Sequence, residues 1–307
     1  MQTKTNTPSP SGYANQVVTK PPAWHTLVVF DILFNNLTTG LFLVAAAAEL
    51  AAPAVFTPVG TWAYPLALML LLIDLGFLVM DLGDKLRFHH MLRVFKLSSP
   101  MSLGTWCLTI YSLFLTAIVA AEFVVVVGWL PGDAGLAWWV RKAAVVGGLP
   151  FAFGSAAYKG VLFSTTAQPG WKDARWLGAY LMNSALLLGA AELLVIAAFV
   201  GETRAVDGLV SAVGLLAALN LVPLSLLAND LQPVLYRLYS QQNRTIAGAS
   251  VFAVGAVIPI GLLLIGSGLA PMSVALVAII LAQFGVRFLI VRLPHIATGP
   301  VLPVEHL

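Results

Sequence analysis

The stretch DLGDKLRFHHMLRVFKLSSPMSLG, residues 81–104, separates two long apolar segments and concentrates charge that is scarce elsewhere. Only 9% of the 307 residues are charged, yet six ionic side chains fall between Asp81 and Lys96. A solvated loop with membrane-anchoring cations would account for this pattern, and so would a surface on which another protein docks. The stretch therefore predicts an exposed basic connector between two helices, with both roles open.

Outside this connector the composition is that of a membrane protein. Hydrophobic residues make up 59% of the chain, against roughly 45–50% in soluble domains. A helix needs about 20 apolar residues to cross a bilayer, whereas a strand needs only about 9–11. The apolar segments are long, and the sequence predicts an all-α integral membrane protein with eight transmembrane helices. We expect them near residues 24–50, 62–82, 102–130, 137–164, 174–200, 206–228, 247–268 and 271–293.

The eight helices are predicted to form two four-helix bundles. Residues 39–50 resemble residues 184–193, and four spans separate the two segments, which favours a parallel repeat. The N-terminal residues lack the short apolar core and small-residue cleavage site of a signal peptide. The expected organisation is a flexible N-terminal tail at 1–23, a first bundle at 24–165 with its docking connector at 83–101, a second bundle at 174–293, and a C-terminal tail at 294–307.

Basic residues are distributed unevenly between the two sides. On the side opposite the termini we expect Arg141, Lys142 and Arg204. The positive-inside rule would place both termini in the cytoplasm, but cations that dock a partner would give the same asymmetry, so sidedness stays open. The side of the termini is expected to carry Lys4, Lys20, Lys85, Arg87, Arg93, Lys96, Lys172, Arg175, Arg237, Arg244, Arg287 and Arg292.

Several acidic residues fall inside the predicted spans. A charged group at membrane depth costs at least about 2.5–3.5 kcal/mol, so each one requires a partner, water or a function. We predict that Asp74, Glu122, Glu192 and Glu49 form a polar thread that conducts protons across the membrane. The alternative is that Asp74, with Asp81 two turns away on the same helix face, pairs with arginines and that the glutamates simply reach water at span ends.

Asp31 and Tyr158 are expected at one level in the membrane. Asp31 lies about seven residues inside the first span and Tyr158 about six residues before the fourth span ends on the same side. With a rise of 1.5 Å per residue, both lie about 10 Å deep. A carboxylate and a phenol at matched depth can hydrogen-bond the two oxygens of a quinone head group.

The sequence offers little support for a redox centre within the chain. Cys107 is the only cysteine, so the chain alone cannot supply the thiolates of an iron–sulfur cluster. The histidines His25, His89, His90, His295 and His306 fall at span ends, in the connector or in the tail, so we expect neither haem nor a metal site. There is no nucleotide-binding fingerprint or zinc spacing, and we expect no nucleic-acid partner.

The connector, ending in Ser99-Pro100-Met101-Ser102, resembles that of the polysulfide reductase NrfD family, whose members are eight-helix quinone-interacting membrane subunits of bacterial redox complexes. Residues 157–164 resemble the family segment whose tyrosine contacts quinone, with Lys159 where threonine is usual. Asp31 lies where a related subunit carries a quinone-binding histidine. The resemblance implies a quinone site, menaquinone or ubiquinone, and we assign to it Asp31, Asn35, Tyr158 and His89.

The resemblance also implies partners. We expect the chain to exchange electrons between the quinone pool and a ferredoxin-like subunit with [4Fe–4S] clusters, docked on Arg87, Arg93 and Lys96. A molybdopterin or other catalytic subunit would complete a respiratory complex in the bacterial inner (plasma) membrane. The chain itself would be a non-catalytic or quinone-reactive subunit, and proton translocation stays open. The alternatives are a secondary transporter, which also uses intramembrane charges, or a purely structural membrane anchor.

Overall fold

The computed structural model describes residues 22, 24–130, 135–266 and 268–297, and within them every regular element is a helix. Eight of the helical segments are long and apolar enough to cross a membrane, as the sequence predicts. The elements are α1 Thr26–Ala51, α2 Pro53–Asp81, the 3-10 helix η1 Lys85–Leu92, α3 Pro100–Val126, α4 Leu136–Ser164, α5 Leu177–Val200, α6 Thr203–Leu238, α7 Gln241–Phe252, the π-helix η2 Ala253–Val257, α8 Ile258–Ile265 and α9 Leu269–Ala297.

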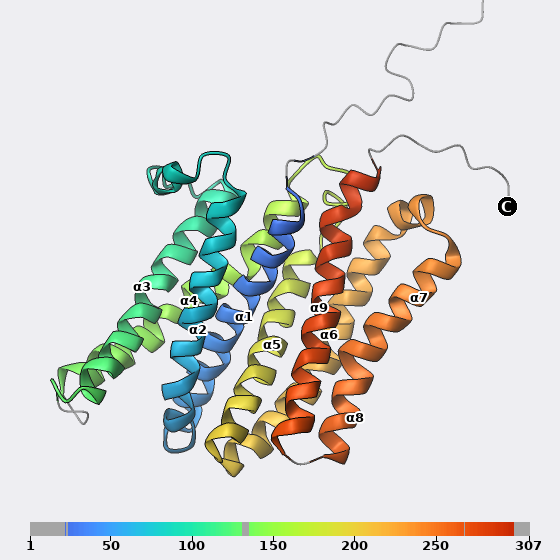
Figure 1. The fold of residues 1–307 in the computed structure, drawn as a ribbon. Helices are drawn as coiled ribbons and strands as arrows, with labels where there is room; N and C mark the ends of the chain where they lie inside the picture. Colours follow the sequence, from blue (N-terminus) through green and yellow to red (C-terminus); the bar gives the residue numbers. More distant parts are fainter. Residues whose placement is uncertain (1–21, 23, 131–134, 267, 298–307) are drawn as a thin grey trace, which may run out of the picture.

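The spans run up and down through one bundle (Figure 1). The start of α1, the end of α9, the connector and the turn between α6 and α7 lie at one end of the bundle, which we call the termini side. The connection between α4 and α5 also lies on the termini side, and the remaining helix connections lie at the opposite end. The predicted tails at 1–23 and 294–307 fall outside the described residues, apart from residue 22 and residues 294–297.

Three predicted boundaries differ from the observed ones because proline does not end these helices. The second span was expected from residue 62, but α2 begins at Pro53, where a proline without an N–H suits the first helical turn. Helix α6 continues through Pro223 and Pro233 to Leu238, ten residues beyond the predicted end. Helix α9 extends to Ala297, into the segment expected to be tail.

Helices α1 and α5 form the centre of the bundle, and most of their residues are buried. Their backbones meet at Gly40 and Gly189: a Cβ on Gly40 would lie 1.9 Å from the carbonyl oxygen of Ala185. Small residues at a crossing let transmembrane helices approach closely. These are the two segments whose sequences resemble each other. The central contact therefore joins the two predicted four-helix halves, and the division into two bundles remains a prediction.

The connector is anchored by its final residues. Ser99 caps α3 by accepting from the Ser102 backbone N–H at 3.4 Å, and Pro100 occupies the first helical turn. The Ser102 side chain donates to the Val94 carbonyl at 2.9 Å and accepts from the Lys96 N–H at 3.0 Å. The Ser-Pro-Met-Ser sequence therefore holds the chain before α3 in place. The preceding η1, by contrast, has no buried residue.

Candidate functional site

A buried ionic group lies near the termini side, where α1, α2 and α4 meet. The Lys159 ammonium lies 2.8 Å from Asp31 Oδ1 and 3.8 Å from Asp74 Oδ1, and it also donates to the Asp31 backbone carbonyl at 3.1 Å. All three side chains are less than one-tenth exposed. Asp74 therefore has a cationic partner from another helix, and that partner is a lysine.

Asn35 extends this group. It follows Asp31 by one helical turn, so both side chains lie on the same face of α1. Its amide nitrogen lies 3.2 Å from Asp74 Oδ2 and 3.1 Å from Ser155 Oγ. We call Asp31, Asn35, Asp74, Ser155 and Lys159 the Lys159 cluster. Charged groups inside a membrane pair with one another in this way because each would otherwise be desolvated without compensation.

A cavity of about 200 Å³ lies beside the Lys159 cluster and beneath the connector. Asp31 and Tyr158, predicted at one depth, both line it, and Lys159 joins them. Residues from α1–α4 and η1 form the walls: Trp24, Val28, Asp31, Leu78, Asp81, Leu82, Gly83, Met91, Met101, Thr105, Leu108, Tyr158, Lys159, Leu162 and Phe163.

Tyr158 owes its position to a glycine on α3. A Cβ on Gly104 would lie 2.0 Å from the Tyr158 ring, so the ring lies directly against the α3 backbone. Gly104 is the last residue of the stretch 81–104, and nothing in the sequence assigns it a role. The identity of a glycine in the sequence does not reveal which side chain of another helix packs against it.

The remaining two predicted quinone-site residues lie outside this cavity lining. Asn35 donates to Asp74, which in turn lies 3.8 Å from the lining residue Lys159. His89 lies on η1 in full exposure, with its ring 4.5 Å from that of His90. Met91, two residues further along, lines the cavity instead.

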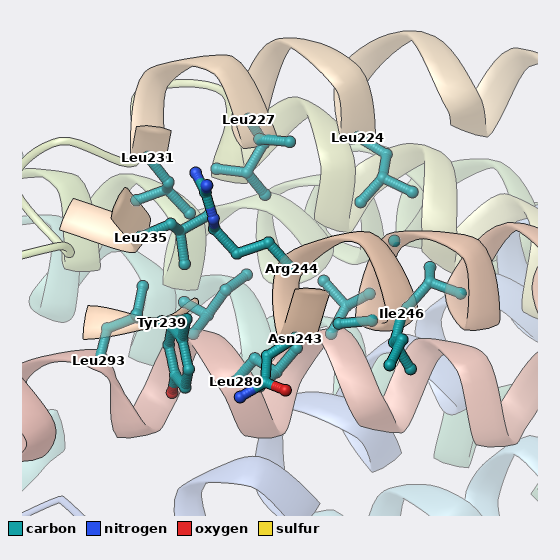
Figure 2. Close-up of a pocket in the computed structure, with 16 residues that line it drawn as sticks. Leu224, Leu227, Leu231, Leu235, Tyr239, Asn243, Arg244, Ile246, Leu289 and Leu293 are labelled. Atoms are coloured by element: carbon teal, nitrogen blue, oxygen red, sulfur yellow. The ribbon is translucent and has the colours of Figure 1, made fainter. Parts of the chain in front are cut away.

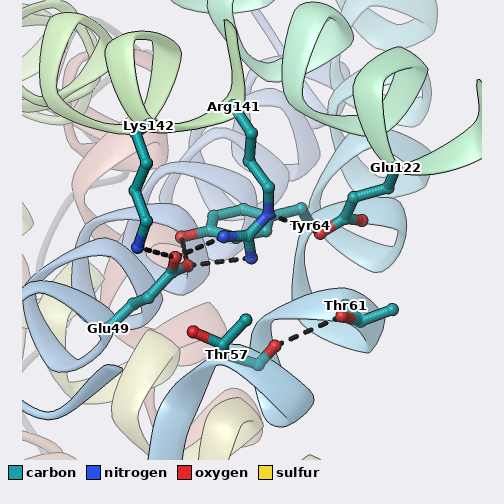
Figure 3. Close-up of polar contacts among 7 residues, drawn as sticks. All are labelled: Glu49, Thr57, Thr61, Tyr64, Glu122, Arg141 and Lys142. Atoms are coloured by element: carbon teal, nitrogen blue, oxygen red, sulfur yellow. Dashed lines mark hydrogen bonds and ion pairs between the residues drawn. The ribbon is translucent and has the colours of Figure 1, made fainter. Parts of the chain in front are cut away.

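A second ionic group lies near the opposite end of the bundle (Figure 3). Arg141 donates to both carboxylate oxygens of Glu49, and its Nε lies 3.0 Å from Glu122. Lys142 Nζ and the Tyr64 hydroxyl contact the same Glu49 carboxylate at 2.8 and 2.9 Å. We call these five residues the Glu49 cluster. Glu49 is fully buried and paired, so the alternative that it reaches water at a span end is wrong.

Between the two clusters the predicted thread is discontinuous. Thr38 and Tyr111 share a hydrogen bond of 2.8 Å in the core, and the Tyr111 hydroxyl also lies 3.0 Å from the Thr38 carbonyl. Glu192 is buried on α5, and its Oε2 has no hydrogen-bond partner among the described residues. Asp74, Glu192 and the Glu49 cluster are thus successive polar points separated by apolar packing.

Arg287 corrects the count of cations on the termini side. It was counted among the cations on the side of the termini, but it is 1% exposed inside α9. Its guanidinium bonds to Asn36 Oδ1 at 3.0 Å, Ser184 Oγ at 2.8 Å and the Gln283 carbonyl at 2.9 Å. Arg287 therefore joins α1, α5 and α9 and does not report on topology. Its position inside the predicted span 271–293 was the sequence feature that could have indicated its burial.

The predicted docking residues Arg87, Arg93 and Lys96 are all exposed, and Arg87 pairs with Asp84 at 3.1 Å. Apolar side chains are exposed among them, with Leu86 at 85% and Leu97 at 71%. No three His, Cys, Asp or Glu side chains gather as metal ligands in the part of the chain that the structure describes.

The fold and its buried charges define a class: a multi-pass membrane protein of eight spans, with a polar cavity beneath an exposed connector. Residues 14–296 match the family model described as polysulphide reductase, NrfD. The chain belongs to this NrfD family, whose members are in general quinone-interacting subunits of oxidoreductase complexes. The resemblance drawn from the sequence is thereby confirmed. The chain has no match among curated proteins.

Proposed function

We propose that this protein is a quinone-reactive subunit of a bacterial inner-membrane respiratory complex, and that it exchanges electrons between the quinone pool and a partner iron–sulfur protein. The observation that carries the proposal is the cavity in which Asp31, Tyr158 and Lys159 come together directly below the connector. A molybdopterin or other catalytic subunit would supply the terminal chemistry.

The cavity's residues fit a quinone head group. Its volume of about 200 Å³ is below the roughly 300–1,000 Å³ of sites for whole drug-sized ligands, which suits a ring whose tail leaves the cavity. The Tyr158 hydroxyl and the Lys159 ammonium are hydrogen-bond donors for the head-group oxygens, and Asp31 is a proton acceptor. A bound quinone supplies two-electron redox chemistry that the protein's own side chains cannot perform.

The chain's own contribution is to bind, orient and move protons. Tyr158 is held against Gly104, and Lys159 is held by Asp31 and Asp74, so both donors are fixed before a ligand binds. Oxidation of a quinol releases two electrons and two protons. The two carboxylates of the lining, Asp31 and Asp81, would each take one of these protons, and the electrons would pass to the partner's iron–sulfur cluster. The contact of Asp31 with Lys159 links it to Asp74.

The electrons require a partner, and the connector is the surface we assign to it. Arg87, Arg93 and Lys96 lie on the exposed segment that covers the cavity, beside exposed apolar side chains. Exposed apolar residues among charges are typical of protein interfaces. An iron–sulfur cluster docked there lies on the same side of the membrane as the cavity.

A proton route from this cavity toward the opposite side would pass Asp74, the Thr38–Tyr111 pair, Glu192 and then Glu49 with Glu122. Carboxylates at successive depths serve such relays in membrane proteins. The support is the order of these groups along the bundle and the buried Oε2 of Glu192, which has no hydrogen-bond partner among the described residues.

The test uses the intact complex with two cavity variants. Tyr158→Phe removes one donor and keeps the ring, so quinone-linked turnover should fall about 10–100-fold, as for loss of a positioned polar group in a dry site. Asp31→Asn should lower turnover more than quinone affinity, because an amide accepts hydrogen bonds but takes no proton. Tyr236→Phe, an exposed tyrosine on α6, is the matched control.

Assembly of each variant is checked by size-exclusion chromatography before the kinetics. Full activity in both cavity variants, with normal assembly, would place quinone chemistry elsewhere and remove the main support for the proposal.

A further inference from the structure

A second cavity, of about 520 Å³, lies between α6, α7 and α9, away from the Lys159 cluster (Figure 2). Leucine, isoleucine and valine side chains make up most of its lining. The polar residues in the lining are Tyr239, Asn243 and Arg244, from the turn between α6 and α7 and the first turn of α7. The cavity is therefore a hydrocarbon-lined space with a polar end on the termini side.

The groove exists because α7 diverges from α9. Near η2 the two segments are close, and a Cβ on Gly255 would lie 3.0 Å from that of Ala282. Toward Gln241 they separate (Figure 1), and α7 has no buried residue. Gly255 and Arg244 are eleven positions apart, so at 1.5 Å per residue the groove is about 16 Å long. A π-helical segment at the narrow end is the sort of irregularity that often marks a functional site.

Small residues widen the groove on the α7 side. Ala247 and Gly248 line it, and a Cβ on Gly248 would meet nothing within 4 Å. Ile246 is 54% exposed beside them and Leu289 on α9 is 37% exposed, so the groove opens to the bilayer. In a membrane such a groove is filled by hydrocarbon, because a packed interior leaves few voids.

The polar end is positively charged. Arg244 lines this end and Arg237 lies in the last turn of α6, and neither has a carboxylate partner among the described residues. The acidic residue on this part of α6, Asp230, is already 3.5 Å from Arg175. Arg244 lies flat over the Tyr236 ring, 3.4 Å from its centroid, which fixes the guanidinium and leaves its edge for an anion.

We propose that this groove binds one phospholipid, with an acyl chain between α6, α7 and α9 and its phosphate at Arg244. The hydrocarbon lining selects the chain, and the unpaired arginines select an anionic head group. The bound lipid completes the packing of α7 against the rest of the bundle.

The test titrates delipidated full-length protein in detergent with dioleoyl phosphatidylglycerol and, in parallel, with dioleoylglycerol, which has the same chains and no phosphate. Bound lipid is counted by native mass spectrometry. We expect one retained phosphatidylglycerol, bound at least about fivefold more tightly than dioleoylglycerol, the factor for one arginine near an anionic lipid. Inorganic phosphate alone should not compete, because it lacks the chain.

Two variants test the acyl-chain site and the head-group site of the groove separately. Gly248→Leu fills the open space in the groove and should abolish retention of both lipids. Arg244→Gln should reduce phosphatidylglycerol binding to the level of dioleoylglycerol. The matched controls are Gly261→Leu on α8, which also has open space around it but lies outside the lining, and Arg204→Gln at the other end of α6. Both should bind as the parent does.

Lipid retention by Gly248→Leu equal to that of Gly261→Leu would overturn the proposal. So would preferential retention of an isoprenoid quinone that Gly248→Leu displaces, because the groove would then hold a quinone tail. If Gly248→Leu does not fold, equal affinity of Arg244→Gln and the parent for phosphatidylglycerol still rejects the head-group assignment.

Discussion

At the scale of single residues, Lys159 organises the polar interior of the termini side. It contacts two carboxylates from different helices, Asp31 at 2.8 Å and Asp74 at 3.8 Å, in a site almost without solvent. A buried ion pair contributes little net stability, but removing one partner leaves an uncompensated charge. Lys159 therefore fixes the positions of the two carboxylates, and its removal should leave both of them without this cationic partner.

The first prediction concerns Lys159→Met. It should destabilise the protein by about 3–5 kcal/mol, the usual cost of breaking a buried ion pair, measured as a lower unfolding midpoint in detergent. Lys142→Met is the control, because Lys142 is one-quarter exposed and Glu49 keeps Arg141. The double variant Asp31→Asn/Lys159→Met should recover part of the loss. Equal effects of Lys159→Met and Lys142→Met would show that the ion pair does not hold this site together.

The second residue-scale prediction concerns Glu192, whose Oε2 is buried without a hydrogen-bond partner among the described residues. A buried polar atom without a partner costs about 1–3 kcal/mol, so Glu192→Leu should leave the fold as stable or stabilise it. If Glu192 lies on a proton route, the same variant should still lower any proton uptake coupled to turnover in vesicles. Retained coupling in a stable Glu192→Leu protein would remove Glu192 from the route.

At the scale of elements, glycines decide how closely the helices approach. Gly104 on α3 gives Tyr158 its place on α4, and Gly40 on α1 meets Gly189 and Ala185 on α5. In a membrane, helix association depends on such close packing because the lipid is as apolar as the side chains. The two contacts have separate consequences, one for the cavity and one for the whole bundle.

The third prediction is that Gly104→Ala mimics the loss of Tyr158. Its new Cβ would lie 2.0 Å from the ring, so the ring must move while alanine still favours the helix. Quinone-linked turnover should fall about tenfold or more, since small misplacements of positioning groups are costly. Gly76→Ala on α2, which has open space around it, should leave turnover unchanged. Normal turnover by Gly104→Ala would mean that the ring position is unimportant.

The fourth prediction is that Gly40→Leu prevents α1 and α5 from meeting. The clash is with backbone, which has little freedom to relax, so the effect should exceed the about 1–3 kcal/mol typical of overpacking. We expect loss of the monodisperse peak in detergent chromatography. Gly208→Leu on α6 is the control, because no atom lies within 4 Å of its Cβ. A normal peak for Gly40→Leu would contradict the close α1–α5 contact.

At the scale of the whole molecule, the charges divide into a buried set and an exposed set. Apart from Glu192, the buried set pairs internally or hydrogen-bonds to polar side chains, as in the Glu49 cluster and around Arg287. Among the described residues, the exposed cations of the connector have one carboxylate partner, in the Arg87–Asp84 pair. The connector is therefore the part of this surface on which a soluble partner would find complementary charge.

The fifth prediction is that reversing Arg87, Arg93 and Lys96 to glutamate reduces co-purification of the iron–sulfur partner at physiological salt. Charge complementarity sets register and association rate at interfaces, so raising the salt should weaken the parent complex in the same direction. Arg204→Glu, a cation at the opposite end, is the control. Unchanged co-purification of the triple variant would remove the connector from the interface.

Much of the candidate site was predictable because depth in a membrane follows from position in a helix. The fixed rise per residue placed Asp31 and Tyr158 at one level, and both line one cavity. Asn35 lay close by for the same reason, since it follows Asp31 by one turn. His89 could not be placed, because the connector has no regular register to count along. Its quinone-binding role remains a prediction.

The sequence alone determined the class of this protein, its eight spans and its family, because apolar length and the Ser-Pro-Met-Ser connector are local properties of the chain. Only the tertiary structure decided which charges pair. In the sequence, Lys159 is only a lysine where the family usually has threonine; in the structure, α1 and α2 bring two carboxylates to it. Arg287 counts in the sequence as a cation of the termini side, whereas in the structure it hydrogen-bonds to Asn36 and Ser184. The reason is physical: a buried charge is satisfied by whichever helices pack around it, and that packing is set by contacts such as Gly40 with Ala185, which lie 145 residues apart in the chain.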